Sequence, residues 1–161
     1  FRLQTPINIV YLKSNKLTIT RRNEMGLDQY ASARKGEPVL VDGGTSTYND
    51  ENGKEVVETI WEKEWADSYD LCDWRKHPNL QGFMESKWCG EGDFNCADLE
   101  LDLEDIDELE ETVKNASLPD TDGFFFGSDA DEHYKEQDLE FCKDARKALA
   151  EGYTVVYSSW W

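Results

Sequence analysis

The sequence predicts an α+β domain, a mostly antiparallel sheet with two or three helices packed on one side. Short runs in which apolar and polar residues alternate, as in strands, occur along the chain. Between these runs lie longer segments with apolar residues three and four positions apart, as in amphipathic helices. The 6 Trp, 7 Tyr and 7 Phe among 161 residues are enough for a core, although 32% of the residues are charged.

Seven segments have the residue pattern of strands. They cover residues 27–35, 38–42, 55–65, 68–74 (a short strand or a turn), 94–101, 124–126 and 153–161. The turn-rich residues 43–53 predict that the second and third segments form a hairpin with a long loop. In the third segment, Val57, Thr59 and Trp61 share one face, which we expect to be the buried one. The apolar run at 124–126 is expected in the centre of the sheet.

Three segments have helical periodicity. The first covers residues 79–88 and follows Pro78, a residue that is favourable in a first helical turn. The second runs to Lys114 from a cap at Asp102, and the third covers 133–151 before a glycine stop signal. The expected buried sides are Leu80, Phe83, Met84 and Trp88; Leu103, Ile106, Leu109 and Val113; and Tyr134, Leu139, Phe141, Cys142, Ala145, Ala148 and Leu149.

Residues 1–24 differ in composition from the rest of the chain. They carry five Lys and Arg and one acid, whereas the chain from Met25 on carries 12 Lys and Arg against 34 Asp and Glu. Residues 21–24 can be encoded by AGG-AGA-AAU-GAA, which contains a purine-rich ribosome-binding sequence just before a Met codon. We therefore expect 1–24 to be a non-native upstream segment or a flexible extension, and 25–161 to form one globular domain. Alternatively, the apolar alternation at 7–11 marks a genuine N-terminal strand.

The strong negative charge, −18 over the whole chain, bears on the partners that the protein can bind. Repulsion from phosphates argues against direct binding of nucleic acid. No apolar stretch has the length of a membrane span and no secretory signal is visible, so we expect a soluble, cytoplasmic protein that does not bind membranes. The acids form either an ordinary solvated surface or an imitation of DNA that occupies a DNA-binding protein. For the second interpretation, the helix after Asp102 offers Glu104, Asp105, Asp107, Glu108 and Glu111.

The four cysteines do not form a familiar metal-binding pattern. No CxxC pair occurs, and the spacing from Cys89 to Cys96 is not typical of zinc sites. Buried free thiols in a reducing compartment are the simpler interpretation, and a metal site at Cys89, Cys96 and His77 is the alternative. The acids between 120 and 132 lack the spacing of a calcium loop. The sequence therefore predicts no metal and no cofactor.

A small basic island at residues 73–81 is the candidate site. Cations held against aromatic rings, beside amides and an imidazole, can orient an anionic or polar ligand. The predicted ligand-binding residues are Trp74, Arg75, Lys76, His77, Asn79 and Gln81, and a pocket there is expected to lie near Phe125, Ser128 or Tyr134. The alternative is structural, with Trp74 in the core, Arg75 paired with a carboxylate, and His77 at the start of a helix.

Four motifs stand in a characteristic order across nearly all of residues 25–161. They are Met25-Gly26-Leu27-Asp28, Trp74-Arg75-Lys76, Gly123-Phe124-Phe125-Phe126-Gly127-Ser128 and Ser158-Ser159-Trp160-Trp161. In these motifs the chain resembles a family of small proteins that phages and some bacteria encode, and that has no established activity. The resemblance implies a phage-type origin and a start at Met25, and it implies no catalytic residues.

From these observations we expect a non-enzymatic binding or interaction protein of phage type that acts on a host or phage protein. The basis is the large acidic excess without a recognisable catalytic set. The alternative is a small enzyme or ligand-binding protein whose pocket lies at 74–81, so the sequence leaves open whether the chain is an enzyme. The two differ in whether the side chains of Arg75 and His77 converge on a cleft or are engaged in ion pairs and caps.

Overall fold

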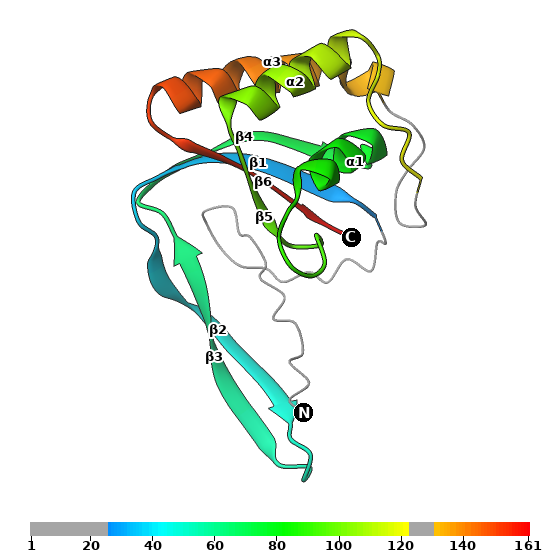
Figure 1. The fold of residues 1–161 in the computed structure, drawn as a ribbon. Helices are drawn as coiled ribbons and strands as arrows, with labels where there is room; N and C mark the ends of the chain where they lie inside the picture. The colour runs from blue at the N-terminus through cyan, green and yellow to red at the C-terminus, as the bar shows by residue number, and fades with distance from the viewer. Residues whose placement is uncertain (1–25, 123–130) are drawn as a thin grey trace. The chain divides into compact units, whose positions relative to one another are not determined.

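The computed structural model describes residues 26–122 and 131–161, which contain three helices and six strands. Figure 1 shows the ribbon with these elements labelled. The predicted α+β class is confirmed. The chain forms two compact units, the hairpin unit of residues 35–68 and the sheet unit made of the remaining described residues. Each unit is described by itself. The expectations for residues 1–24 and for a strand at 124–126 lie outside the described residues.

The sheet unit contains a four-stranded sheet of β1 (Asp28–Lys35), β4 (Asp67–Arg75), β5 (Asp98–Leu101) and β6 (Thr154–Trp160). The strand order is β4-β1-β6-β5. Strand β6 is antiparallel to both neighbours, with Ala31 and Leu99 both aligned with Tyr157. The predicted strand at 94–101 is shorter than expected, because regular pairing begins only at Asp98.

Three helices pack on one face of this sheet: α1 (Pro78–Lys87), α2 (Leu103–Lys114) and α3 (Asp131–Ala150). The core includes alternate sheet residues, which therefore share a face: Ala31, Ala33, Leu99, Leu101, Val155 and Tyr157. The same core takes side chains from all three helices. The helices lie on one side of the sheet in Figure 1, as predicted. No helix among the described residues is long and apolar enough to cross a membrane.

Helix α2 begins at the predicted cap. The Asp102 side chain accepts a hydrogen bond from the backbone N–H of Asp105, and the Asp105 side chain accepts one from the backbone N–H of Asp102. Ile106 and Leu109 are buried, as expected. The prediction was wrong for Leu103, which is 54% exposed at the first helical position, so the buried stripe starts one turn later.

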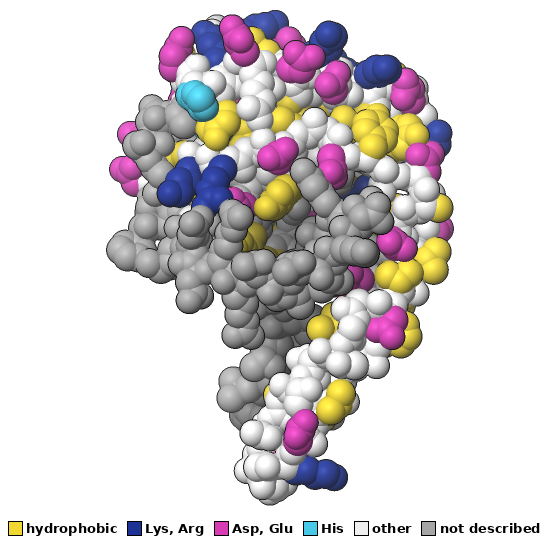
Figure 2. Space-filling model, turned by 180° about the vertical axis from the view of Figure 1, so that it is seen from behind, with side chains coloured by type: hydrophobic (Ala, Val, Ile, Leu, Met, Phe, Trp, Pro, Cys, Tyr) yellow, Lys and Arg dark blue, Asp and Glu magenta, His cyan; other side chains and the backbone are white. Residues whose placement is uncertain are grey.

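The acids of α2 are interrupted by cations from both neighbouring helices. Lys87 of α1 lies 3.6 Å from Asp105 and also pairs with Glu108. Arg146 of α3 pairs with Asp107 and Glu110, and its guanidinium is the main cause of the lowered pKa of Glu110. Lys and Arg lie among the Asp and Glu side chains of the surface in Figure 2. Three of the five acids proposed to imitate phosphates are therefore already paired with cations.

The hairpin unit is one antiparallel pair, β2 (Val39–Asn49) and β3 (Glu55–Glu64). The expectation of a long loop at 43–53 was wrong, because β2 continues through its glycines. A register shift after Asp42 accommodates them, and the Asp42 carboxylate accepts a hydrogen bond from the Gly44 N–H. Gly44 has a φ of 106°, a conformation that side chains disfavour. The connection itself is a tight turn closed by Asp50 and Lys54.

The hairpin unit has no core of its own. None of residues 35–68, all of which the structure describes, is buried. Hydrophobic side chains lie open on the hairpin surface: Val39, Leu40, Val57 and Trp61 at 60% exposure and Tyr48 at 46%. The expected burial of the face with Val57 and Trp61 was therefore wrong, because alternation along a strand separates two faces but does not determine which one is covered.

Candidate functional site

The structure divides the six predicted ligand-binding residues into two groups. Four of them are buried, with exposed fractions of 4% or less: Trp74, His77, Asn79 and Gln81. The other two, Arg75 and Lys76, are exposed. The predicted burial of Trp74 is confirmed.

A sharp turn between β4 and α1 separates the two groups. The backbone N–H of Lys76 donates a hydrogen bond of 2.8 Å to the carbonyl of Leu27. This bond lies one residue past the end of β4. Lys76 has a φ of 56°, which is uncommon for a residue with a side chain. His77 is then the N-cap of α1, and Pro78 occupies the first turn, as predicted. This turn directs His77 into the core immediately after two exposed cations.

Asp138 of α3 joins Trp74 to His77. Its Oδ1 accepts a hydrogen bond from Trp74 Nε1 at 2.8 Å, and its Oδ2 lies 2.9 Å from His77 Nε2. Asp138 and His77 are both fully buried. Burying a carboxylate is costly unless both oxygens have partners, and here both do. This carboxylate ties the end of β4, the start of α1 and the middle of α3 together.

Asp138 was missing from the sequence prediction, although a signal for it exists. It is four residues after Tyr134 and three before Phe141, so it lies on the apolar side of α3 at helical spacing. A single acid on an apolar stripe indicates a buried partner. The prediction instead assigned only apolar and small residues to that side.

A second set of hydrogen bonds holds His77 from the sheet. Gln29 of β1 accepts from the His77 backbone N–H at 3.0 Å and donates to the His77 carbonyl at 3.1 Å. Gln29 also donates to the Tyr157 hydroxyl, which in turn donates to Gln81 at 2.6 Å. Burial raises the pKa of Tyr157, so its hydroxyl remains a donor. The buried amides therefore orient the histidine backbone.

The remaining side of His77 faces the start of α3. The Tyr134 ring stacks on the imidazole at 4.8 Å, and the Tyr134 hydroxyl donates to the carbonyl of Arg75 at 2.7 Å. His77 Nδ1 lies 3.8 Å from a carboxylate oxygen of Asp131, too far for a direct hydrogen bond. Asn79 donates to the other oxygen of Asp131 at 3.1 Å. Tyr134 lies near the island, as predicted, whereas Phe125 and Ser128 lie outside the described residues.

This arrangement fixes the orientation of the His77 imidazole in the core. A carboxylate behind an imidazole is the geometry that positions a catalytic base, but the imidazole is fully buried. Within the described ranges, no serine, threonine or cysteine side chain hydrogen-bonds to it. Arg75 Nε reaches Asp28 at 3.9 Å, as predicted for the structural alternative, with the Arg75 side chain 45% exposed. Such a long, exposed ion pair contributes little to stability.

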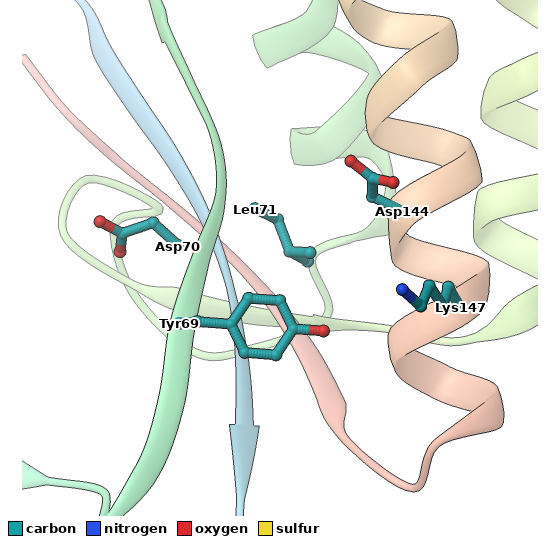
Figure 3. Close-up of a pocket in the computed structure, with 5 residues that line it drawn as sticks. All are labelled: Tyr69, Asp70, Leu71, Asp144 and Lys147. Carbon is teal, nitrogen blue, oxygen red and sulfur yellow. The ribbon is translucent and has the colours of Figure 1, made fainter.

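A cleft of the sheet unit lies elsewhere, between β4 and α3, with a volume of about 240 Å³ (Figure 3). Its lining residues are Tyr69, Asp70, Leu71, Asp144 and Lys147. In Figure 3 the Tyr69 ring and the Lys147 side chain extend towards each other across it. The volume is below the roughly 300–1,000 Å³ of typical small-molecule sites. None of the six predicted residues lines this cleft.

The described residues provide no group of three His, Cys, Asp or Glu side chains that could hold a metal ion. The cysteines differ instead in their accessibility. Burial raises the pKa of the Cys142 thiol to about 12 and that of the Cys72 thiol to about 11. Cys89 is exposed.

We expect an alkylating reagent at mildly alkaline pH to modify Cys89 first and Cys142 only on unfolding. The thiolate is the reactive form, and a raised pKa with burial suppresses it. Mass spectrometry of peptides after timed alkylation, with and without urea, measures this order. Equal rates for the two cysteines in the folded protein would contradict the packing of α3 described above.

Comparisons with protein-family models, with curated proteins and with solved structures found no match.

Proposed function

We propose that this chain is a non-enzymatic interaction protein that binds a protein partner, of host or phage origin, through its β2–β3 hairpin. The exposed apolar surface of the hairpin unit carries the proposal. A two-stranded hairpin alone is at best marginally stable in water, and this one has no buried residue. Exposed apolar side chains gathered on such an element are typical of interaction sites.

The strand edges of the two units support the same assignment. In the sheet unit, edge strand β5 has only four residues. At edge strand β4, side chains of α3 bond to the backbone: Gln137 donates to the Asp73 carbonyl at 2.7 Å, and Tyr134 donates to that of Arg75. Short and covered edges resist pairing with other chains. Strands β2 and β3 pair only with each other among the described strands, and each is ten or more residues long.

One face of the hairpin indicates the charge of the partner. This Glu62 face consists of Val39, Val41, Ser46, Tyr48, Val56, Glu58, Ile60, Glu62 and Glu64. It combines five large apolar side chains with three carboxylates and no cation. A partner surface with apolar groups and Lys or Arg side chains complements it.

A comparison of charge variants tests the proposed function. The immobilised full chain is expected to capture a specific protein from bacterial lysate. The captured amount should fall at high salt, because salt screens the charges of the two surfaces. The double variant Glu58→Lys/Glu64→Lys should lose that protein. The matched control Glu100→Lys/Glu104→Lys makes the same change at exposed acids of the sheet unit and should retain it. Capture of no specific protein, or equal capture by both variants, would contradict the proposal.

The alternative is a small-ligand site at 74–81, which one observation favours. Two buried nitrogens, His77 Nδ1 and Gln81 Nε2, have no hydrogen-bond partner within the part of the chain that the structure describes. A buried polar group is normally satisfied by a protein group or an ordered water or ion, and a bound molecule can take that place. A thermal-shift screen with nucleotides, sugars and metal salts tests it, since a ligand at about 100 times its Kd stabilises by roughly 2.7 kcal/mol. An unchanged melting temperature throughout would count against this alternative.

A further inference from the structure

The second face of the hairpin has a different character from the Glu62 face. This Trp61 face consists of Leu40, Asp42, Thr45, Thr47 and Asn49 on β2 and Glu55, Val57, Thr59, Trp61 and Lys63 on β3. Its centre holds the cross-strand pair Thr45 and Thr59, between Val57 towards the turn and Trp61 towards the other end. Leu40, Val57 and Trp61 are each 60% exposed. The surface is therefore apolar and weakly polar, with charges near its two ends.

We propose that the Trp61 face is the contact surface for a second copy of this chain, with two hairpins packed face to face and antiparallel. The β3 residues of this face are arranged symmetrically about Thr59. A two-fold axis beside Thr59 and its neighbour Thr45 brings Glu55 of one copy opposite Lys63 of the other. It also brings Val57 of one copy against Trp61 of the other, and each contact occurs twice.

The charges select this arrangement over the other ways of pairing two hairpins. A parallel face-to-face arrangement gathers both Lys63 side chains at one end and both Glu55 side chains at the other, so like charges lie close together and repel. Pairing through the Glu62 face places Glu58, Glu62 and Glu64 of both copies together without a cation. The antiparallel Trp61-face pair is the arrangement in which unlike charges meet and the tryptophans are covered.

The size of the Trp61 face sets the strength of the association. Glu55 and Lys63 are separated by eight residues of β3, about 27 Å at roughly 3.4 Å per residue, and the face is only two strands wide. Its area is a few hundred Å² per copy, below the roughly 800 Å² per partner of a standard interface. We therefore expect a reversible dimer whose population rises with protein concentration.

Sedimentation velocity of the purified full chain over a concentration series tests the proposal. The wild type should shift from monomer to dimer, and Trp61→Lys should weaken association at least about tenfold. Lys63→Glu and Glu55→Lys should each weaken it about three- to tenfold, because each change creates two like-charge contacts. The double variant Lys63→Glu/Glu55→Lys should restore association, and Glu64→Lys on the opposite face should not weaken it.

Three outcomes would overturn the proposal. One is a monomer at every concentration. Another is a dimer that Trp61→Lys and Lys63→Glu leave unchanged, which would place the contact elsewhere. The third is a double variant as weak as its single variants. The inference rests on the proposed role of the hairpin as a contact element. Its variants change the Trp61 face and are measured with the purified chain alone, whereas the variants that test partner binding change the Glu62 face. Either proposal can therefore fail without the other.

Discussion

Replacing Trp74 with alanine is expected to destabilise the protein by about 4–8 kcal/mol. Removing a large buried aromatic costs about 3–5 kcal/mol. Trp74 is 3% exposed and packs edge-on against Phe141, with ring centres 5.1 Å apart. The change also removes the donor to Asp138 Oδ1 in a buried site, which adds about 1–3 kcal/mol. The total is comparable to the whole stability of an ordinary domain, about 5–15 kcal/mol.

Urea denaturation followed by circular dichroism measures this loss. Trp74→Phe is the comparison variant, since it keeps an aromatic ring in the core while it removes the indole N–H and part of the ring volume. We expect it to cost less than half as much as the alanine variant. A Trp74→Ala protein with an unchanged denaturation midpoint would show that the end of β4 does not depend on this side chain.

Replacing Asp138 with alanine is expected to cost about 3–5 kcal/mol, although the change removes only a small side chain. The carboxylate is the partner of both Trp74 Nε1 and His77 Nε2, and the structure keeps all three groups away from water. Hydrogen bonds to a charged group contribute about 1.5–3 kcal/mol each, and buried groups left without a partner bear the full penalty. The loss therefore exceeds that expected from side-chain volume.

Two further variants distinguish the stability lost with the hydrogen bonds of Asp138 from the stability lost through any substitution in α3. Asp138→Asn keeps the shape and one acceptor, so one of the two donors retains its partner, and we expect an intermediate cost of about 1–3 kcal/mol. Glu140→Ala changes an exposed acid of the same helix and should stay within about 0.5 kcal/mol of wild type. Equal stability of the Asp138 and Glu140 alanine variants would contradict the network.

The helices were predictable because their signals are local. In α2, the cap at Asp102 and the burial of Ile106 and Leu109 depend on neighbours within one or two turns. Helical periodicity over twelve or more residues leaves little ambiguity in such segments. The last strand along the chain, β6, was also predictable, and it lies within the predicted range of residues 153–161.

The faces of the hairpin were not predictable from its alternation. Alternate residues of a strand lie on opposite faces, but the covered face is decided by other layers of the fold. In the hairpin unit no such layer exists, so Trp61 is open where its pattern suggested burial. The glycines that suggested a loop instead allow a register shift within β2, because a bulge and a loop use the same residue types.

The elements around the candidate site were predictable from the sequence, but the geometry of its side chains was not. Arg75 and His77 are two positions apart and end up on the surface and in the core, respectively. The left-handed conformation of Lys76 produces this separation, and nothing in a lysine side chain signals it. Asp138, more than sixty residues from Trp74 along the chain, is joined to it only by the packing of α3 on β4.

The strand order of the sheet unit has a consequence for how the chain folds. β6, the last described element along the chain, lies between β1 and β5, so Asp28 pairs with Trp160. Contacts between such distant residues raise the contact order, and they slow folding because a long loop must close first. During synthesis, the turn at Asp50 and Lys54 can bring β2 and β3 together early. The edge of β1 that pairs with β6 must wait for β6 to leave the ribosome, so a nascent chain presents its hairpin before its sheet is complete.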